Sequence, residues 1–525
     1  MSLDLDALIE ALSDPAVYPH GPGAVHVIQT HISVIFIAGD LVYKIKKPVN
    51  FGFLDFTTLE KRKFYCHREI ELNSRYSEGI YLDVVSIFHG RSGINLNSDG
   101  REIDVAVKMK RIPEDRMLIN MLRNEVVTSE ILDRLADRIA DIHSQAPTNV
   151  EITRYGSLDV VKHNVGENFN QTEPFIGRTI EPNIYETIQK LSTDFLTHNH
   201  ELFNERVRAG FIRDCHGDLH VEHVIVLNGI MLFDCIEFNE RFRYCDTASD
   251  IGFLLMDLDF QGYPAYTDRV IRRYTATSGD AGIPLIVRFY QYYRAFVRGK
   301  VIGFTLDEPE VSDAEKETAI QTARDYFALA LTYLKSRPEP TLIITCGVSG
   351  SGKGYVASRL GERIGTEPIR SDVIRKKMYG VEKTEHRLDN YGEGIYRSSA
   401  TERTYNALLD QARSHLTKGK SVILDASFSS RDHRMRAVDL AQKYGARFRI
   451  IECVSPEDVL QRRVEYRLKE GTDPSDMRVD ILERQLEDFE PIEDIDPMYV
   501  WRCDSTLDVN DFLVNFVRDW LVSDH

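Results

Sequence analysis

The stretch at residues 341–364 constrains the fold of this chain more than any other part of the sequence. An apolar run rich in β-branched residues, TLIITC, ends in the glycine-rich segment GVSGSGKG at 347–354, and a helix-forming sequence begins directly after it. Glycine accepts the backbone conformations of a tight turn, so successive N–H groups can point at one anion. A helix N-terminus and the ammonium of Lys353 add positive charge at the same place. The sequence therefore predicts a phosphate-binding loop between a strand and a helix.

The residues of this loop are the candidates for binding the phosphates of ATP or GTP. They are Gly347, Ser349, Gly350, Ser351, Gly352, Lys353 and Gly354. Loops of this kind usually follow the lysine with a serine or threonine, whose hydroxyl binds Mg²⁺. Gly354 stands at that position here, as a glycine does in adenylate-kinase-like enzymes. The loop therefore predicts a phosphate site but offers no hydroxyl ligand for a metal after the lysine.

Length and composition limit the class of protein. At 525 residues the chain exceeds one ordinary domain, so we expect two or more. Its net charge of −17 repels phosphate backbones, which argues against non-specific nucleic-acid binding. The 7 cysteines include no C-x-x-C pair. The N-terminal segment is unlike a secretory signal. No apolar run reaches the length of about 18 residues that a membrane helix needs. We therefore expect a cytoplasmic protein with reduced thiols and no membrane segment, and no feature of the sequence sets an oligomeric state.

Strand and helix patterns both occur in the first 335 residues. A short helix and a loop are expected over 1–30, then a hairpin whose strands at 33–38 and 41–48 flank a Gly39-Asp40 turn. A charged helix at 58–75 and strand-like runs at 82–88 and 102–109 follow. Helical patterns lie at 129–143, 185–209 and 286–335. The order of these elements is that of a protein-kinase small lobe: strands that carry a lysine come first, then a helix that carries a glutamate, and then further strands.

Three spaced motifs extend this similarity. They are CHGDLHVEH at 215–223, MLFDCIEF at 231–238 and CDTASDIGF at 245–253. Together with the lysine hairpin, they resemble the aminoglycoside phosphotransferase and choline kinase group, relatives of the protein kinases, over roughly residues 25–335. The resemblance implies an α+β, protein-kinase-like bilobal domain at 1–335, with a small lobe over about 1–112 and a large lobe over about 113–335.

The resemblance also implies roles for individual residues. Asp218 resembles the catalytic base that orients and deprotonates the acceptor hydroxyl, and Asp234 resembles the Mg²⁺-binding aspartate. Lys44 resembles the lysine that pairs with the α- and β-phosphates, and Glu69 resembles its partner on the helix. These are the parts that phosphoryl transfer requires, because positive charge must offset the phosphates and a carboxylate must aim the nucleophile.

Some of these assignments leave alternatives open. Lys46 rivals Lys44 on the same hairpin, and Glu71 rivals Glu69 on the same helix. The catalytic loop of the family ends in an asparagine that is a second ligand of Mg²⁺, and His223 stands at that position here. Imidazole nitrogen suits Mn²⁺ or Zn²⁺ better than the hard Mg²⁺ ion. The domain is therefore either a kinase with an altered metal site, with Mn²⁺ as an alternative to Mg²⁺, or a kinase fold kept as a scaffold.

A proline-containing segment, SRPEP at 336–340, is the expected linker to a second domain at 341–525. Strand and helix patterns alternate to the end of the chain, which predicts an α/β P-loop domain with a parallel sheet and crossover helices. Three features resemble small P-loop kinases, namely gluconate kinase, the zeta-toxin group and polynucleotide 5′-hydroxyl kinases. They are SDVIR at 371–375, LDASF at 424–428 and the arginine-rich helix around 460–467.

In those relatives the aspartate of the SDVIR-like motif takes the proton of the acceptor, and the arginine of the same motif steadies the acceptor. The resemblance therefore implies these roles for Asp372 and Arg375. Asp425 corresponds to the second acidic strand end, close to the metal and acceptor. Arg463 and Arg467, spaced i,i+4, resemble lid arginines that clamp the transferring phosphate. The plainer alternatives are an N-cap for Asp372 and a solvated helix face for the two arginines.

We therefore expect a two-domain phosphotransferase, each domain moving the γ-phosphoryl group of ATP, with Mg²⁺, to a hydroxyl of a small molecule. One rival is that the C-terminal domain is a nucleic-acid 5′-hydroxyl kinase, which the net charge disfavours. Another is a non-catalytic, nucleotide-controlled regulatory module built from two degraded kinases, which Gly354 and His223 favour.

Overall fold

The structure is a computed structural model that describes residues 5–91, 93–96, 100–307, 311–335, 339–381, 394, 397–470 and 479–522, with the backbone alone at 467–470, 479–481 and 522. Within it the chain forms two compact units. The first comprises Met1–Asp257 and Asp268–Leu334, and the second comprises Leu258–Thr267 and Lys335–His525. Residues 336–338 of the expected linker lie outside the described residues.

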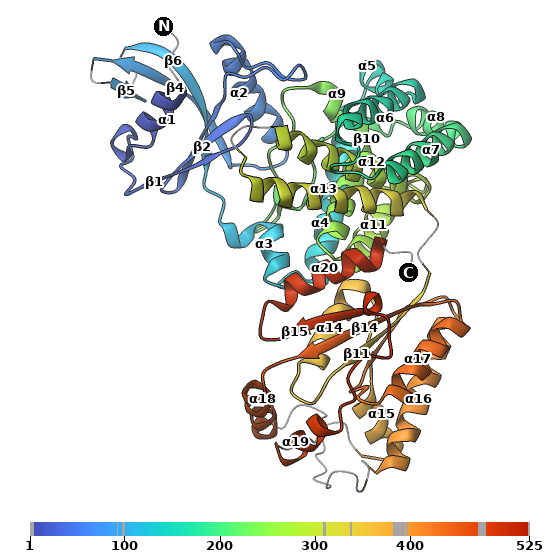
Figure 1. The fold of residues 1–525 in the computed structure, drawn as a ribbon. Helices are drawn as coiled ribbons and strands as arrows, with labels where there is room; N and C mark the ends of the chain where they lie inside the picture. Colours follow the sequence, from blue (N-terminus) through green and yellow to red (C-terminus); the bar gives the residue numbers. More distant parts are fainter. Residues whose placement is uncertain are drawn as a thin grey trace. The chain divides into compact units, whose positions relative to one another are not determined.

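The first unit contains a six-stranded antiparallel sheet with the order β1-β2-β3-β6-β4-β5 (Figure 1). The strands are β1 Val25–Gln29, β2 Ser33–Ala38, β3 Leu41–Lys46, β4 Tyr81–Gly90, β5 Gly93–Asn95 and β6 Arg101–Lys110. The predicted hairpin around the Gly39-Asp40 turn is confirmed as β2 and β3. The loop expected up to residue 30 is wrong at β1, an edge strand whose side chains are mostly exposed.

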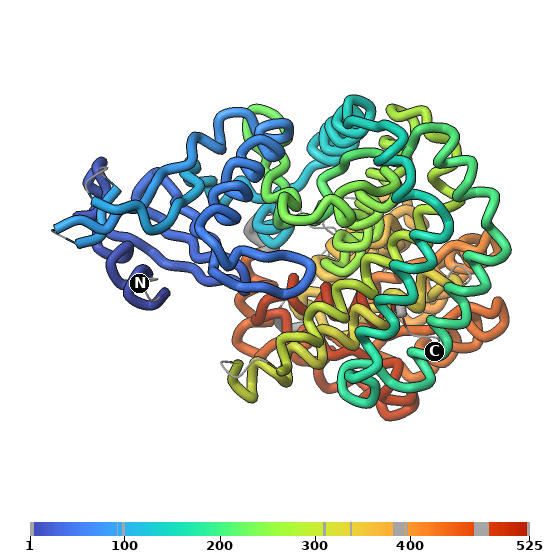
Figure 2. Tube along the Cα trace, turned by 90° about the horizontal axis from the view of Figure 1, so that it is seen from above, coloured from blue at the N-terminus to red at the C-terminus, as the bar shows by residue number. Residues whose placement is uncertain are grey.

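Helices α1 (Leu5–Leu12) and α2 (Leu59–Asn73) cover opposite faces of this sheet. Tyr43 and Ile45 of β3 pack with α1 residues, whereas Val42 packs in the cluster that includes Cys66 of α2. Because side chains alternate along a strand, residues 44 and 46 share the face of residue 42 and point toward α2. The sheet and its two helices form the blue part of the trace in Figure 2.

The rest of the first unit is mainly helical. Its helices are α3 Leu118–Arg123, α4 Ser129–Gln145, α5 Val150–Arg154, α6 Leu158–Thr172, α7 Pro182–His198, α8 His200–Arg208, α9 Glu240–Arg243, α10 Thr247–Phe260, α11 Pro264–Ser278, α12 Ile283–Phe304 and α13 Asp313–Leu334. The end of α10 and the start of α11 lie in the stretch Leu258–Thr267, which belongs to the second unit. The segments 185–209 and 286–335, each expected to be helical, are α7–α8 and α12–α13. Two short antiparallel pairs lie around the motifs at 215–223 and 231–238. They are β7 Ile212–Asp214 with β10 Tyr244–Asp246, and β8 Val224–Val226 with β9 Ile230–Leu232.

The second unit contains a five-stranded sheet with the order β12-β13-β11-β14-β15, and every strand pair in it is parallel (Figure 1). Its strands are β11 Thr341–Cys346, β12 Ile369–Arg370, β13 Val422–Asp425, β14 Arg447–Val454 and β15 Val500–Asp504. Its helices are α14 Lys353–Ile364, α15 Ser371–Met378, α16 Ser398–Leu416, α17 Arg431–Lys443, α18 Glu457–Glu470, α19 Val479–Glu487 and α20 Val509–Val522. The predicted parallel sheet with crossover helices is confirmed.

Helices cover both faces of the parallel sheet, and the strand β11 is buried along its whole length. Leu342 and Ile344 belong to the cluster shared with α16 and α17, whereas Ile343 belongs to the cluster shared with α14 and α20. This burial on both faces explains why β11 is a continuous apolar run rather than an alternating one. Among the described residues, no helix is long and apolar enough to cross a membrane.

Candidate functional site

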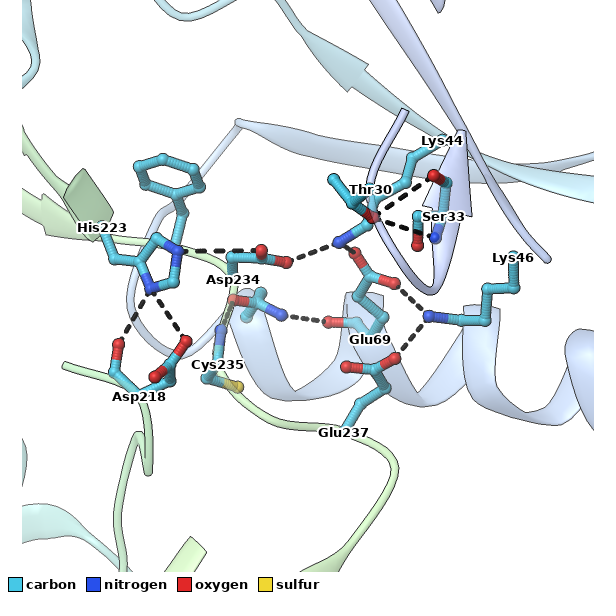
Figure 3. Close-up of polar contacts among 12 residues, drawn as sticks. Thr30, Ser33, Lys44, Lys46, Glu69, Asp218, His223, Asp234, Cys235 and Glu237 are labelled. Atoms are coloured by element: carbon cyan, nitrogen blue, oxygen red, sulfur yellow. Dashed lines mark hydrogen bonds and ion pairs between the residues drawn. The ribbon is translucent and has the colours of Figure 1, made fainter. Parts of the chain in front are cut away.

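The side chain of Lys44 connects three parts of the first unit (Figure 3). Its ammonium nitrogen, on β3, lies 3.0 Å from Oε1 of Glu69 on α2 and 2.5 Å from Oδ1 of Asp234, which follows β9. Glu69 is fully buried, whereas 12% of the Lys44 side chain and 39% of the Asp234 side chain are exposed. The lysine therefore stands at the open edge of a buried ion pair. The contact predicted between Lys44 and Glu69 exists, and the binding of nucleotide phosphates by Lys44 stays a prediction.

The rival residues have different surroundings. The ammonium of Lys46 lies 2.6 Å from Oε2 of Glu69 and also pairs with Glu237, and its side chain is almost completely buried. Two buried carboxylates therefore enclose Lys46 and leave it no open side. Glu71 is exposed and pairs with Arg68 across 2.8 Å. The geometry favours Lys44 and Glu69 over Lys46 and Glu71 as the pair that faces a ligand.

Asp234 has an unusual backbone conformation. Its φ angle is +60°, in the left-handed region that residues other than glycine seldom adopt. The backbone N–H of Asp234 donates a hydrogen bond to the hydroxyl oxygen of Tyr81 across 3.1 Å, and the next N–H, of Cys235, donates to the side-chain oxygen of Asn73 across 2.9 Å. Such strain persists where surrounding contacts hold it, and it is concentrated at functional sites. Burial alone would raise the pKa of Asp234, but Lys44 and His223 together lower it more, so the carboxyl group is ionised.

The loop that carries Asp218 is fixed through its backbone. One oxygen of the buried Asp250 carboxylate accepts a hydrogen bond from the N–H of Gly217 across 2.8 Å. The other accepts from the N–H of His216 across 3.1 Å and lies 3.1 Å from Nε2 of His143. The Asp218 side chain itself is 34% exposed. Asp250 therefore holds the loop from inside while Asp218 remains accessible.

Two histidine rings lie beside Asp218. Nε2 of His220 and Nδ1 of His223 each lie 3.6 Å from Oδ2 of Asp218, and the ring centroids are 4.0 Å apart. Burial would raise the pKa of Asp218, but His220, His223 and other neighbouring charges together lower it. Burial would lower the pKa of His220, but Asp218 and Asp257 together raise it. Burial and the neighbouring His220 lower the pKa of His223. Asp218, His220 and His223 can bring ligand atoms within 4.8 Å of one another, so they could hold a metal ion together.

In the second unit, the loop 347–354 has the conformation that its glycines predict. Gly347, Gly350 and Gly352 have φ angles of +138°, +84° and +91°. A Cβ atom at Gly347 would lie only 2.4 Å from the carbonyl oxygen of Cys453, so close approach also requires glycine there. The loop leads from β11 into α14, whose first residue is Lys353.

The loop backbone makes polar contacts on both sides. The ammonium of Lys353 lies 2.7 Å from the carbonyl oxygen of Val348, and the N–H of Ser349 donates to the side-chain oxygen of Gln485 across 3.0 Å. The hydroxyl of Ser351 is buried with no hydrogen-bond partner among the described residues. The cradle expected for a phosphate is present, and the binding of a nucleotide by these residues stays a prediction.

The structure explains the glycine at position 354. A Cβ atom there would lie 3.3 Å from both Nη2 of Arg370 and Oδ2 of Asp425. These two residues pair across 3.1 Å, and the other Asp425 oxygen lies 3.3 Å from the hydroxyl of Thr345. The Arg370–Asp425 pair therefore occupies the space beside the start of α14 where a serine or threonine side chain would otherwise extend.

Asp372 lies at the second position of α15, two residues after β12 ends. The N-cap of this helix is Arg370, so the alternative that Asp372 is the N-cap is wrong. Burial raises the pKa of Asp372, and Arg375, one turn along the helix, partly offsets the increase. Arg375 is 8% exposed. Asp425 ends β13 and the phosphate loop follows β11, so these groups lie at the same ends of three neighbouring parallel strands.

Arg463 contacts the phosphate loop from its carbonyl side. Its guanidinium donates to the carbonyl oxygen of Gly350 across 3.2 Å and to the hydroxyl and carbonyl oxygens of Ser505 across 2.6 and 2.9 Å. In a loop whose N–H groups face an anion, this contact supports the backbone from behind. A recess of about 390 Å³ on α18 is lined by Arg463 together with Val459, Arg462 and Tyr466. The side chain of Arg467 lies outside the described residues.

Several residues of these sites had no role in the sequence-based prediction. They are Tyr81, Asp250, Glu237, Arg370 and Gln485. Asp250 stands in one of the quoted motifs, and Glu237 follows Asp234 by three residues, so both had a signal in the sequence. Tyr81, Arg370 and Gln485 had none, because their contacts depend on how distant segments meet.

Comparison with protein families matches residues 342–492 to the AAA domain family. The match begins at the second residue of β11 and spans the phosphate loop, Asp372 and Asp425. Over this range the second unit is therefore similar to AAA domains.

Comparison with curated proteins finds relatives along most of the chain. An uncharacterised protein of Mycobacterium tuberculosis and one of Mycobacterium bovis are each 29% identical over 453 residues, which cover 86% of this chain and 87% of each relative. Among solved structures, a gluconokinase from Sinorhizobium meliloti is 20% identical with a TM-score of 0.26, and covers 36% of this chain and 100% of its own. A choline/ethanolamine kinase family protein from Mesorhizobium loti is 13% identical with a TM-score of 0.35, and covers 62% of this chain and 99% of its own.

Proposed function

We propose that this protein is a two-domain phosphotransferase in which each unit binds ATP and transfers its γ-phosphoryl group to a hydroxyl of a small molecule. The observation that carries the proposal is the loop 347–354, with left-handed glycines and with Lys353 at the first turn of α14. Backbone N–H groups, a helix N-terminus and an ammonium converge there, which is the arrangement that binds the phosphates of a nucleotide.

The second unit also has groups suited to the transfer itself. Asp372 lies near the phosphate loop in the strand order and has a raised pKa, which suits a base that takes the proton of an acceptor hydroxyl. Arg375 supplies positive charge on the same helix. The Asp425 carboxylate fits Mg²⁺ as an oxygen ligand, and the ion, when bound, would neutralise charge on the β- and γ-phosphates. Arg463 would hold the loop in shape.

In the first unit, the resemblance to aminoglycoside phosphotransferases and choline kinases and the site geometry support the same reaction. Lys44, at the open edge of its pair with Glu69, would bind phosphate oxygens. Asp218, ionised and accessible on a loop anchored by Asp250, would orient the acceptor hydroxyl and take its proton. Asp234 offers a carboxylate to the metal. The net charge of −17 favours a small-molecule acceptor over a nucleic acid.

The test uses the full-length protein, γ-labelled ATP and pools of hydroxyl compounds such as sugars, amino alcohols and nucleosides. We expect labelled products that fall into two groups, one lost in Asp218→Asn and the other lost in Asp372→Asn. The matched controls Asp141→Asn and Asp439→Asn, at exposed positions of the two units, should retain both groups. ADP formation that is the same in the wild type and in the Asp218→Asn/Asp372→Asn double variant would contradict phosphotransfer and favour a regulatory module.

A further inference from the structure

The helix α12 carries two arginines on the face that meets the loop of Asp218. The guanidinium of Arg294 donates a hydrogen bond to the carbonyl oxygen of Gly217 across 3.0 Å, and it lies 5.0 Å from the centroid of the Phe253 ring. Arg294 therefore supports the backbone just before the proposed base. Residues four apart share one face of a helix, so Arg298 follows one turn later on the same face.

Arg298 differs from buried arginines such as Arg206, which pairs with Asp280 across 2.8 Å. In the part of the chain that the structure describes, no carboxylate lies within ion-pair distance of Arg298, and the centroid of the Tyr326 ring lies 5.7 Å from its guanidinium carbon. A guanidinium has five N–H donors, more than one phenol oxygen can accept. A partly buried cation without a carboxylate partner is uncommon, because it loses hydration that no anion replaces. Arg298 thus keeps donors for an anionic ligand.

The charge of Arg298 acts on Asp218 without an ion pair between them. Burial would raise the pKa of Asp218, but the two nearby histidines and, after them, Arg298 are among the positive groups that together lower it. The side chain of Asp218 is 34% exposed and Arg298 is partly exposed, so a ligand can reach both. An acceptor whose hydroxyl contacts Asp218 would therefore bring its neighbouring groups within reach of Arg298.

We propose that Arg298 binds an oxyanion of the acceptor, so that the first unit phosphorylates hydroxyl compounds that carry a carboxylate or a phosphate. The inference rests on the proposed function of that unit. A guanidinium binds either oxyanion through two parallel N–H···O bonds, which fix its orientation. A neutral acceptor would leave these donors unpaired in a partly buried place, which selects against it.

The transfer itself needs no further reactant. The hydroxyl oxygen of the acceptor forms a bond to the γ-phosphorus of ATP, and the bond from that phosphorus to the bridging oxygen breaks. ADP leaves with the electron pair of the broken bond, and Asp218 takes the proton of the hydroxyl. Arg298 holds the oxyanion of the acceptor, which is unchanged in the product.

The experiment compares pools of related acceptors. Full-length protein carrying Lys353→Ala and Asp372→Asn, which weaken the second nucleotide site and remove its proposed base, is incubated with γ-labelled ATP. The pools are neutral sugars and polyols, the hydroxy acids derived from them, and their phosphate monoesters. We expect labelled products from an oxyanion pool, with kcat/KM about tenfold or more above that of the neutral parent compounds. Product from the hydroxy acids alone, or from the phosphate esters alone, identifies the oxyanion.

Variants of Arg298 test whether this residue produces the preference. Arg298→Gln should remove it, chiefly by raising KM for the oxyanion compounds. Arg298→Lys keeps the charge without the two parallel donors, so it should retain only part of the preference. Arg272→Gln, at an exposed position on α11, is the matched control and should retain all of it.

A parent protein that prefers the neutral pool, or a preference unchanged in Arg298→Gln, would overturn the inference. Labelled product that is lost in Asp218→Asn would then still support the proposed function. If Arg298→Gln loses the thermal transition of the first unit, Arg298→Lys decides the outcome, and an unchanged preference in that variant overturns the inference.

A binding measurement separates the inference from the proposed function. The parent protein with a non-hydrolysable ATP analogue is titrated by calorimetry with individual hydroxy acids and phosphate esters. Binding that Arg298→Gln weakens, in a protein that forms no labelled product, would support the oxyanion site and contradict phosphotransfer by the first unit. If no oxyanion compound is either labelled or bound, the inference is overturned.

Discussion

The backbone N–H of Ser349 donates a hydrogen bond to the side-chain oxygen of Gln485 across 3.0 Å, which ties the phosphate loop to α19. The carbonyl of the same peptide group belongs to Val348 and lies 2.7 Å from the ammonium of Lys353. A trans peptide places its N–H and its carbonyl on opposite sides. Gln485 and Lys353 therefore hold one peptide of the loop from both sides, and Gln485 is a positioning residue of the loop.

Replacing Gln485 by alanine should weaken ATP binding by the second unit. The loss of one neutral hydrogen bond costs about 0.5–1.5 kcal/mol, which corresponds to a two- to tenfold increase in the dissociation constant. Gln485→Glu keeps an acceptor but brings a negative charge near the phosphates, so it should weaken binding further. Isothermal titration calorimetry measures both, with the exposed Gln442→Ala on α17 as control. Tighter binding in Gln485→Ala would show instead that the amide competes with the phosphates.

The two lysines of β3 should have separable effects. Lys46→Met leaves Glu69 and Glu237 buried with less positive charge, and breaking a buried ion pair in this way costs about 3–5 kcal/mol. Lys44→Met leaves Glu69 still paired with Lys46, so this buried carboxylate keeps a partner. The loss in the free energy of unfolding should therefore be smaller. Its nucleotide affinity should fall about tenfold, because a charge-assisted contact is lost.

Urea unfolding and nucleotide titrations of the two variants, both in the Lys353→Ala background, test this separation. If Lys46→Met were stable but bound ATP poorly, and Lys44→Met were unstable but bound ATP normally, the roles of the two lysines would be reversed.

The two proposed bases should respond differently to pH. The pKa of Asp218 is lowered, because the nearby histidines and other positive charges together outweigh burial, whereas burial raises the pKa of Asp372. A base must be ionised to accept a proton, and a carboxyl group with a raised pKa is protonated first as the pH falls. The transfer activity of the second unit should therefore decline at a higher pH than that of the first.

Asp218→Asn and Asp372→Asn each retain one activity, so the transfer rate of each variant measured against pH shows separately where each unit loses activity at low pH. If the two activities declined at the same pH, or the activity of the first unit declined at the higher pH, the assignment of one base or the other would be contradicted.

Local sequence determined the elements that depend on neighbouring residues. The phosphate loop was predictable because its glycines, its lysine and the buried run of β11 are consecutive. The hairpin was predictable because Gly39-Asp40 separates two β-rich runs. The position of β6 between β3 and β4 was not predictable. When antiparallel neighbours lie far apart in sequence, the packing of the sheet and not a connecting turn determines which strands pair.

The same distinction applies to the site. Alternation along β3 places Lys44 and Lys46 on one face, so the sequence could not choose between them. The choice depends on Asp234 and Glu237, which lie about 190 residues away and meet different lysines. Arg463 was predicted as a clamp on the transferring phosphate, but its contact with the carbonyl of Gly350 requires the fold of α18 against the loop. Long-range contacts of this kind leave no pattern in the local sequence.

If both units bind ATP, each chain has two nucleotide sites, and a count of bound nucleotide per chain measures this. Full-length protein is titrated with a non-hydrolysable ATP analogue in the presence of Mg²⁺ and Mn²⁺, and the number of sites per chain is measured for the wild type, Lys353→Ala, Asp234→Ala and the double variant. We predict two sites in the wild type, one weakened at least tenfold by each single change, and both weakened in the double variant. A single site per chain that Lys353→Ala abolishes and Asp234→Ala leaves intact would contradict the account of the first unit.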